Sequence, residues 1–352
     1  MPKDKDAREM LELPSAMAAR LIGWMLIGAL LLVGTSLLLP INSYYRFQQG
    51  DGTILFRARY IYERIHFDDT PIDVAMIGSS RMEASIRATE LSRLLSELVG
   101  RPIHVVNFGL PEEGRDLHWI VAQELLGNRP EVRLLVLSAG RESQISHPGF
   151  RFLGDDYSIA TEPLVYNSYY LQNLLTVPYQ HIAYSVQAVW PRAFGLSSAF
   201  NPDIYHARSF DPADSFQGPN FFVDRNKKLD AAQIDAQRAA VARSFGETGF
   251  ARFFPLDQQY AVERTFLRRI DCLAQQKGVR LAFLLVPVYD EENQFVDFPF
   301  YGRIGPVIEA TQLGADPDNY MDVGHLGRRG TAKLTPWLAE RLAPLLMNAE
   351  RH

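Results

Sequence analysis

Cysteine is nearly absent from this sequence, and charge is not concentrated anywhere along it. The single cysteine among 352 residues, Cys272, excludes an intrachain disulfide, so packing must hold the fold together. It lies in a helical pattern with no reactive motif around it, so we expect a partly buried structural thiol. The 36 Lys and Arg residues and 41 Asp and Glu residues give a net charge of -5. Without a basic stripe, a P-loop or zinc-type spacing, we expect no nucleic-acid partner and no bound metal.

What the sequence does contain is one long uncharged run. Residues 21–41 hold no charged side chain, and about 20 apolar residues suffice to cross the hydrocarbon core of a bilayer. We therefore predict a transmembrane anchor. A buried core helix is disfavoured because the run is apolar on every face. A cleaved signal peptide is disfavoured because its apolar region is usually only about 7–15 residues long and ends at small residues.

Flanking positive charge predicts the orientation of this anchor. Four Lys or Arg residues precede the run and one follows closely: Lys3, Lys5, Arg8, Arg20 and Arg46. Because Lys and Arg favour the cytoplasmic side, we expect residues 1–20 in the cytoplasm and the main domain outside it. In a bacterium this corresponds to a single-pass protein of the inner membrane with a periplasmic domain.

Beyond a predicted juxtamembrane connector at residues 42–70, apolar runs alternate with helical patterns. Four short runs are typical of buried parallel strands: 73–77, 103–108, 132–137 and 279–286. Apolar residues at helical spacing lie between or after them: 89–99, 117–126, 261–276 and 331–346. The alternation predicts an α/β domain over residues 71–348 with a parallel sheet, whose functional groups gather at the carboxyl ends of the strands.

The alternation is lost between residues 143 and 255. This segment is rich in aromatic residues and too long for a plain linker, so we expect an insertion organised by helices. Two interpretations stay open. The aromatic residues either build a small satellite core, or they form a lid or groove for sugar rings or for a partner membrane protein.

Three short motifs next to these elements carry candidate chemistry. Ser80 stands at a turn after the first strand, where its hydroxyl would be exposed beside backbone N–H groups. Gly109 ends the second strand and lets the backbone approach closely. Asp322 precedes His325 by three residues, so its carboxylate can fix the tautomer of a histidine base. Each motif alone is weak evidence, since Gly-Ser-Ser is a common turn and serine a common N-cap.

Taken in order, Gly-x-Ser, Asn-x-Gly and Asp-x-x-His resemble the SGNH, or GDSL-like, hydrolase superfamily over most of residues 73–345. The resemblance implies a three-layer α/β/α sandwich and chemistry without a metal or a cofactor. It implies Ser80 as the nucleophile, His325 as the general base and Asp322 as the residue that orients it. The backbone N–H groups of Ser80 and Gly109 would form the oxyanion hole.

Further substrate or oxyanion contacts are expected from the flanks of these motifs: Ser79, Arg81, Asn107 and Arg141. The sequence departs from the family pattern after the third strand. Where the family usually has Gly-x-Asn-Asp, this chain has Gly-Arg-Glu-Ser at residues 140–143. The departure favours a specialised transferase over a general hydrolase.

An N-terminal anchor joined to such a domain is similar to two subgroups. One is the DltD family of teichoic acid D-alanylation; the other comprises the alginate and cellulose O-acetylation proteins of exopolysaccharide systems. Both subgroups imply a membrane-bound O-acyltransferase and a polysaccharide as partners. We therefore expect serine-dependent O-acyl transfer, with acetyl as the favoured group. An anchored carbohydrate esterase and a non-catalytic assembly partner remain the alternatives.

Overall fold

The computed structural model describes residues 15–112, 114–140, 142–236, 253–290 and 297–347. At its centre lies a five-stranded parallel sheet with the strand order β2-β1-β3-β6-β7. The strands are β1 (Val74–Gly78), β2 (Val105–Gly109), β3 (Leu134–Ala139), β6 (Arg280–Leu285) and β7 (Val307–Glu309). The four predicted strands are confirmed to within a few residues. β7 was not predicted, because three residues give too short a pattern to distinguish from a loop.

Helices cover both faces of this sheet, because successive strand residues point to opposite sides. In β3, Leu135 and Leu137 join one apolar cluster, and Leu134 and Val136 join the other. The first cluster packs against α4 (Arg57–His66), α7 (Arg115–Asn128) and α14 (Ala261–Gln276). The second packs against α5 (Ser80–Ser85), α6 (Ala88–Val99) and α16 (Arg328–Met347). The predicted α/β architecture with a parallel sheet is thus confirmed.

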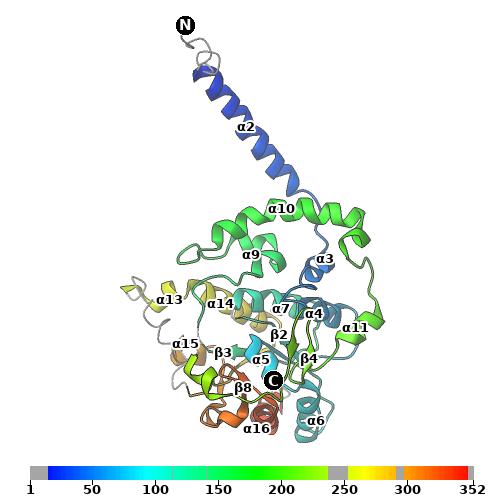
Figure 1. Cartoon of the computed structure of the whole chain (residues 1–352), viewed down its shortest axis with the longest axis vertical. Helices are drawn as coiled ribbons and strands as arrows, with labels where there is room; N and C mark the ends of the chain where they lie inside the picture. The colour runs from blue at the N-terminus through cyan, green and yellow to red at the C-terminus, as the bar shows by residue number, and fades with distance from the viewer. Residues whose placement is uncertain (1–14, 113, 141, 237–252, 291–296, 348–352) are drawn as a thin grey trace, which may run out of the picture.

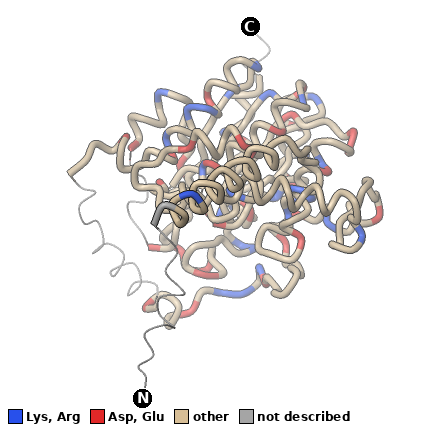
Figure 2. The backbone as a smooth tube through the Cα atoms, turned by 90° about the horizontal axis from the view of Figure 1, so that it is seen from above, with Lys and Arg blue, Asp and Glu red and all other residues tan. Residues whose placement is uncertain are grey.

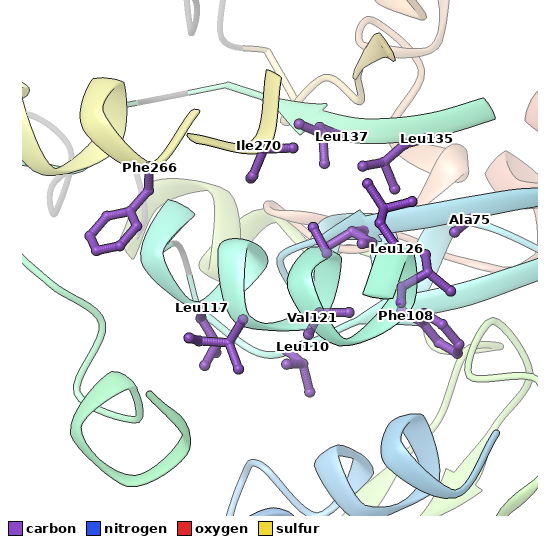
Figure 3. Packing of buried hydrophobic residues seen from close by; sticks show 14 of the residues in the cluster. Ala75, Phe108, Leu110, Leu117, Val121, Leu126, Leu135, Leu137, Phe266 and Ile270 are labelled. Atoms are coloured by element: carbon purple, nitrogen blue, oxygen red, sulfur yellow. The ribbon is translucent and has the colours of Figure 1, made fainter. Parts of the chain in front are cut away.

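Figure 3 shows the first of these interfaces from close by. Phe266 and Ile270 of α14 lie above α7, and Leu117 and Val121 of α7 point into the same core. All four side chains are almost fully buried. This packing holds the helices of this layer against one face of the sheet. The carboxyl ends of the strands therefore keep fixed positions.

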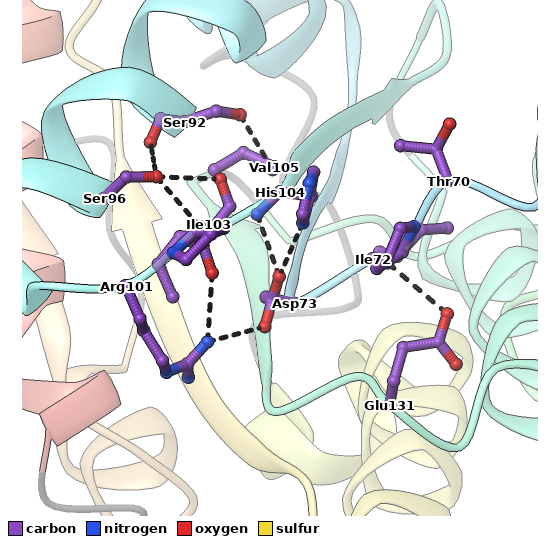
Figure 4. A network of polar contacts seen from close by, with 12 residues as sticks. Thr70, Ile72, Asp73, Ser92, Ser96, Arg101, Ile103, His104, Val105 and Glu131 are labelled. Carbon is purple, nitrogen blue, oxygen red and sulfur yellow. Dashed lines mark hydrogen bonds and ion pairs between the residues drawn. The ribbon is translucent and has the colours of Figure 1, made fainter.

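A cluster of polar side chains connects β1, β2 and α6 at the amino-terminal edge of the sheet (Figure 4). The Asp73 carboxylate accepts hydrogen bonds from the His104 backbone N–H at 2.9 Å and from Arg101 Nη1 at 3.0 Å. Ser92 of α6 accepts the Val105 N–H at 2.9 Å. These bonds set the register of β2 beside β1, which aligns Gly78 with Gly109 at the other edge.

Residues 42–70 belong to the domain rather than to a connector, which corrects the prediction. They form α3 (Ser43–Gln48) and α4, and Phe47 and Ile61 of these helices join the main core. The Glu63 carboxylate is fully buried and accepts bonds from Tyr44 at 2.5 Å and from Arg59 at 2.8 Å. Charged side chains of this segment, such as the ion pair of Arg59 and Glu63, are buried inside the fold.

The predicted insertion between β3 and α14 is present as a helical segment with one small hairpin. Its described elements are α8 (Phe150–Leu153), α9 (Asp156–Ala160), α10 (Tyr170–Val189), η1 (Pro191–Phe194), α11 (Pro202–Arg208), β4 (Phe216–Gln217) and β5 (Phe222–Val223). Short elements complete the domain: α13 (Leu256–Gln259), α15 (Phe298–Gly302), η4 (Thr311–Leu313), η5 (Pro317–Asn319), β8 (Tyr320–Asp322) and β9 (His325–Leu326). The hairpin and the α10 helix both bear on function below.

The N-terminal helix α2 (Ser15–Ser36) extends away from the domain (Figure 1). Its residues 17–36 have a mean hydropathy of 1.9, and none of the apolar window is buried by the rest of the chain. This helix is long and apolar enough to span a membrane. The helix begins and ends earlier than the predicted span of residues 21–41.

The surface of the domain carries charges of both signs. Figure 2 shows Lys and Arg interspersed with Asp and Glu across the described backbone. Cys272 lies exposed on α14, which corrects the prediction of a partly buried thiol. The helical pattern around it was right, but position 272 faces outward while its neighbours at 270 and 274 are buried.

Candidate active site

Ser80 begins α5 directly after the turn that ends β1. Gly78 is required at this turn, because an added Cβ would lie 2.7 Å from the Cβ atoms of Met82 and Ser138. Ser79 occupies the N-cap position with extended backbone angles. The Ser80 hydroxyl is thereby placed at the carboxyl edge of the sheet, where parallel α/β folds gather their sites.

Asp322 and His325 face each other across the small hairpin of β8 and β9. The His325 ring Nδ1 lies 2.9 Å from Asp322 Oδ1 and 3.1 Å from Oδ2. The same Oδ1 accepts the backbone N–H groups of Gly324 and His325, each at 2.9 Å. One carboxylate therefore shapes the turn and orients the imidazole.

These two segments, 245 residues apart in sequence, meet at a single hydrogen bond. Ser80 Oγ lies 2.8 Å from His325 Nε2. Since Asp322 accepts the Nδ1 proton, Nε2 is the acceptor and the serine hydroxyl donates. The His325 and Asp322 side chains are 29% and 32% exposed, so the group is open to a substrate. The three residues predicted as nucleophile, base and orienting acid thus form one continuous hydrogen-bonded chain.

The electrostatics of this chain favour an ionised acid. Burial alone would raise the pKa of Asp322, but the hydrogen bond and charge of His325 and two backbone N–H groups lower it overall. A carboxylate held ionised stabilises the imidazolium that forms when a serine gives up its proton. The arrangement can therefore activate Ser80 for attack on an ester carbonyl.

Backbone hydrogen bonds from two other segments hold the β8–β9 hairpin in place. The Leu229 N–H, from the insertion, donates to the Tyr320 carbonyl at 3.1 Å. The Tyr289 N–H, from the loop after β6, donates to the Val323 carbonyl at 2.9 Å. The insertion therefore helps to position His325, although it contributes neither Ser80 nor His325 itself.

Gly109 and Asn107 do not have the roles that the sequence predicted. The Gly109 N–H donates to Asn107 Oδ1 at 3.0 Å, so it is already engaged. An added Cβ on this glycine would lie 2.5 Å from the Glu83 nitrogen. The glycine is needed because α5 packs directly on the end of β2. Of the two predicted oxyanion donors, only the Ser80 N–H, the first of α5, has no acceptor among the described residues.

Asn107 is a structural residue rather than a substrate contact. Its side chain is buried, and its amide nitrogen lies 3.0 Å from the Glu83 carbonyl and 2.9 Å from the Ile86 carbonyl. These carbonyls end α5. Asn107 therefore fastens the helix that carries Ser80 to the neighbouring strand.

Two other predicted contacts, Ser79 and Arg81, adjoin Ser80 in sequence but do not line the cavity described next. Ser79 is buried beneath the turn. Arg81 extends toward the end of β3, where its Nη1 would lie 3.7 Å from a Cβ added at Gly140. Glu142 points into the protein, with Oε2 at 3.2 Å from Arg264 Nε, and burial raises its pKa to about 7. The predicted contact at Arg141 falls outside the described residues.

A cavity of about 300 Å³ opens beside the Ser80 hydroxyl, and sequence reasoning missed its walls. Besides Ser80, Asp322 and His325, it is lined by Ile54, Phe56, Glu83, Pro111, Phe216, Phe221, Val223, Arg225 and Met321. Five of these wall residues come from the segment before α4 and from the β4–β5 hairpin of the insertion: Ile54, Phe56, Phe216, Phe221 and Val223. Only Glu83 had a readable signal: it follows Ser80 by three residues on a helix and so shares its face.

Glu83 and Arg225 are the charged residues among these walls. Glu83 is the one nearer to Ser80 in sequence. It is almost fully buried, and its Oε1 has no hydrogen-bond partner among the described residues. Burial raises its pKa, against the opposing charges of Arg57, Arg225 and His325. The Arg225 guanidinium donates to the Pro212 carbonyl at 3.0 Å and so is held against the insertion.

No protein-family model matches this sequence, and no curated protein matches it either.

Proposed function

We propose that this chain is a membrane-anchored, SGNH-like serine O-acyltransferase that acts on an extracytoplasmic polysaccharide. The observation that carries the proposal is the continuous chain from Ser80 Oγ through His325 to Asp322, with successive distances of 2.8 and 2.9 Å. The order of the motifs around it and the parallel sheet agree with the resemblance to that superfamily. An accessible histidine and an adjacent cavity leave room for an ester substrate.

The reaction has two matched halves. Ser80 Oγ attacks the carbonyl carbon of an acyl ester, and its proton moves to His325 Nε2. The leaving alcohol oxygen takes that proton as its bond to the acyl carbon breaks, which leaves an ester on Ser80. A sugar hydroxyl then gives its proton to His325 and attacks this ester, and Ser80 regains its proton. Asp322 stabilises the imidazolium in both halves.

The helix α2 supports the proposed location. As an anchor with its positive flank in the cytoplasm, it would hold the domain on the outer side of the membrane. An acyl donor must then reach that side, and a membrane-bound O-acyltransferase is the partner that would supply it. Acetyl is the group that the resemblance favours.

Hydrolysis is the second outcome that the same geometry supports. The acyl ester on Ser80 is identical in both reactions, and the difference is whether water or a sugar hydroxyl attacks it. The exposed side of His325 admits either acceptor. Product analysis with an acylated donor and a polysaccharide acceptor separates transfer from hydrolysis.

The first test is labelling of the full-length protein in detergent with a fluorophosphonate probe, which reacts with activated serines. Wild type should be labelled, and Ser80→Ala and His325→Ala should lose the label. Ser143→Ala is the control, because that hydroxyl lies on the surface and bonds a local carbonyl. A folded wild type that takes no label would contradict the enzyme proposal and favour a non-catalytic assembly role.

A further inference from the structure

The cavity beside Ser80 bears on the identity of the acyl group, and this inference rests on the proposed function. Three phenylalanine rings form much of its wall. The Phe56 centroid lies 5.9 Å from both Phe216 and Phe221, and these two lie 6.4 Å apart. Ile54 and Val223 extend the apolar surface.

The size of the cavity exceeds what an acetyl group needs. Its volume is about 300 Å³, whereas one water-sized group takes roughly 30 Å³. Acetyl adds a single methyl group beyond the ester carbonyl. An acetyl ester on Ser80 would leave most of the apolar wall in contact with water, which is unfavourable.

The chemistry of the wall favours a hydrocarbon chain over a sugar ring. Phenylalanine has no hydroxyl or N–H to bond a sugar, unlike tyrosine and tryptophan. The one guanidinium in the wall, Arg225, donates to Pro212 and Met321. We propose that this cavity binds an acyl chain several methylene groups longer than acetyl, with its carbonyl at Ser80 and its tail against Phe56, Phe216 and Phe221.

The test compares p-nitrophenyl esters of acetate, butanoate, hexanoate and octanoate on the full-length protein. Wild type should show a kcat/KM that rises at least about tenfold from acetate to hexanoate, since each added methylene finds an apolar contact. Val223→Trp, which narrows the cavity, should move the preference back to acetate. Phe222→Ala is the matched control, because Phe222 neighbours Phe221 on the hairpin but is exposed and outside the cavity.

The outcomes separate this inference from the proposed function. Cleavage of every ester with a preference for acetate would overturn the chain-length proposal and leave the serine chemistry intact. A Val223→Trp variant whose preference does not move toward acetate would count against the chain-length proposal as well. No cleavage of any ester, together with no probe labelling, would instead reject the proposed function itself.

A second, independent observation concerns α10, which exposes most of its large apolar side chains. Its apolar side chains point outward: Leu171, Leu175, Tyr179, Ile182, Val186 and Val189 are 38–74% exposed. Its inward face buries the polar side chains of Asn173, Gln180 and His181 at 1–5% exposure, beside Val177 and Tyr184. A helix on the water-exposed surface of a domain has the opposite arrangement.

Three side chains of the buried face attach α10 to the domain by hydrogen bonds. Asn173 Nδ2 donates to Glu162 Oε1 at 2.9 Å, and His181 Nε2 lies 2.8 Å from Asp156 Oδ2. Gln180 bonds the Arg151 carbonyl. The orientation of the helix is therefore fixed by specific bonds, and its apolar side cannot rotate inward.

The place of α10 identifies what covers its apolar side. His181 Nδ1 lies 2.6 Å from the carbonyl of Leu39, just after the end of α2. Figure 1 shows α10 lying crosswise to α2 at the top of the domain, where the chain leaves the apolar helix. If α2 spans the bilayer, α10 lies at the level of the lipid headgroups.

Composition supports the same occupant. From Tyr170 to Trp190 the chain has no Asp, Glu, Lys or Arg, and Trp190 is 64% exposed at the end of the helix. Tyrosine and tryptophan are enriched at membrane interfaces, and a helix in the interfacial plane buries its apolar face among lipids. We infer that α10 lies in the outer leaflet of the membrane that α2 crosses, and that it holds the domain in a fixed orientation relative to the bilayer.

The test uses the single native cysteine. Full-length protein with Cys272→Ser and either Leu175→Cys or Val186→Cys is labelled with a polarity-sensitive fluorophore and reconstituted into phosphatidylcholine–phosphatidylglycerol vesicles. Lipids with a spin label near the headgroup should quench both sites several-fold more than a fluorophore on the native Cys272, which is exposed on α14. Lipids labelled near the bilayer centre should quench them less.

Two results would overturn the membrane assignment. Equal quenching at positions 175, 186 and 272 would mean that α10 faces water, or a protein surface in the native cell. Stronger quenching from the bilayer centre would mean that α10 inserts across the membrane. Both engineered positions are exposed, so the variants should retain the wild-type near-ultraviolet circular dichroism.

Discussion

Single atoms decide most of the chemistry at the residue scale. Asp322 Oδ1 accepts from the His325 ring and from the N–H groups of Gly324 and His325. One oxygen therefore fixes the turn, the ring orientation and the tautomer. A substitution that removes its charge but keeps an acceptor therefore separates the proposed catalytic role of Asp322 from its role in folding.

Asp322→Asn is expected to preserve the fold and lower kcat. The amide oxygen can still accept the two backbone N–H groups, but the amide NH₂ would face His325 Nδ1 and favour a proton on Nε2. Ser80 would then lose its acceptor, and kcat for ester cleavage should fall about 10³- to 10⁴-fold. Steady-state assays with p-nitrophenyl esters measure kcat, and a thermal unfolding curve shows whether the fold is preserved. An unchanged kcat would show that Asp322 is dispensable for orienting the histidine.

Gly109→Ala tests whether close packing, rather than an available N–H, explains that glycine. The new Cβ would lie 2.5–2.7 Å from atoms of Glu83, so α5 must shift. We expect a loss of about 1–3 kcal/mol in the free energy of unfolding, accompanied by weaker probe labelling at Ser80. Gly127→Ala is the control: it lies in α7 with nothing within 4 Å of the new Cβ and should be stabilising. Equal effects of the two substitutions would contradict the packing explanation.

At the scale of elements, the short helix α5 depends on one side chain of the neighbouring strand. Asn107 contacts three carbonyls at the end of this helix, those of Met82, Glu83 and Ile86. A six-residue helix has little stability of its own. The position of Ser80 therefore depends on Asn107.

Asn107→Asp should detach the end of α5. The substitution keeps an acceptor for the Gly109 N–H but places a buried carboxylate against carbonyl oxygens, and we expect a cost of at least about 2 kcal/mol. Urea unfolding measures the change. Asn128→Asp is the matched control, because Asn128 makes one exposed bond to the Glu124 carbonyl. Comparable losses in both variants would mean that the Asn107 contacts add nothing specific.

Element patterns were readable from the sequence where burial is uniform. The strand at residues 132–137 was predicted because parallel strands buried on both faces are continuously apolar. The α14 boundaries were also predicted, since its apolar stripe faces one core. The α10 helix was not, because most of its large apolar residues face outward and three of its five buried residues are polar, which differs from the pattern of a water-exposed amphipathic helix.

The candidate site was readable in part for a similar reason. Ser80, Asp322 and His325 stand in short local motifs, and sheet topology brings such motifs together. The engagement of the Gly109 N–H depends on the Asn107 rotamer, which no local motif records. The phenylalanine wall comes from two distant segments, around residues 56 and 216–221, so only the folded chain reveals it.

For the whole molecule, buried ionisable groups couple stability to pH. Asp116 is fully buried at the start of α7 and accepts the N–H groups of Leu117 and His147 at 2.9 and 2.8 Å. Burial raises its pKa to about 8, although these two N–H groups oppose the shift. The carboxyl group is therefore largely protonated in the folded protein at neutral pH, whereas in the unfolded chain it is ionised above about pH 4.

This difference predicts the sign of a pH effect. Between about pH 4 and pH 8 the folded protein holds a proton at Asp116 that the unfolded chain releases, so its free energy of unfolding falls as pH rises. One such group contributes a slope of at most about 1.4 kcal/mol per pH unit.

Asp116→Asn stays neutral at every pH, so its stability relative to wild type should increase from pH 5 to pH 8. Urea unfolding at these two values measures the slope, with Asp271→Asn on the surface of α14 as the control that should run parallel to wild type. Parallel slopes for Asp116→Asn and wild type would show that the buried carboxyl group is ionised in the folded protein, with its charge stabilised by the two N–H groups that it accepts.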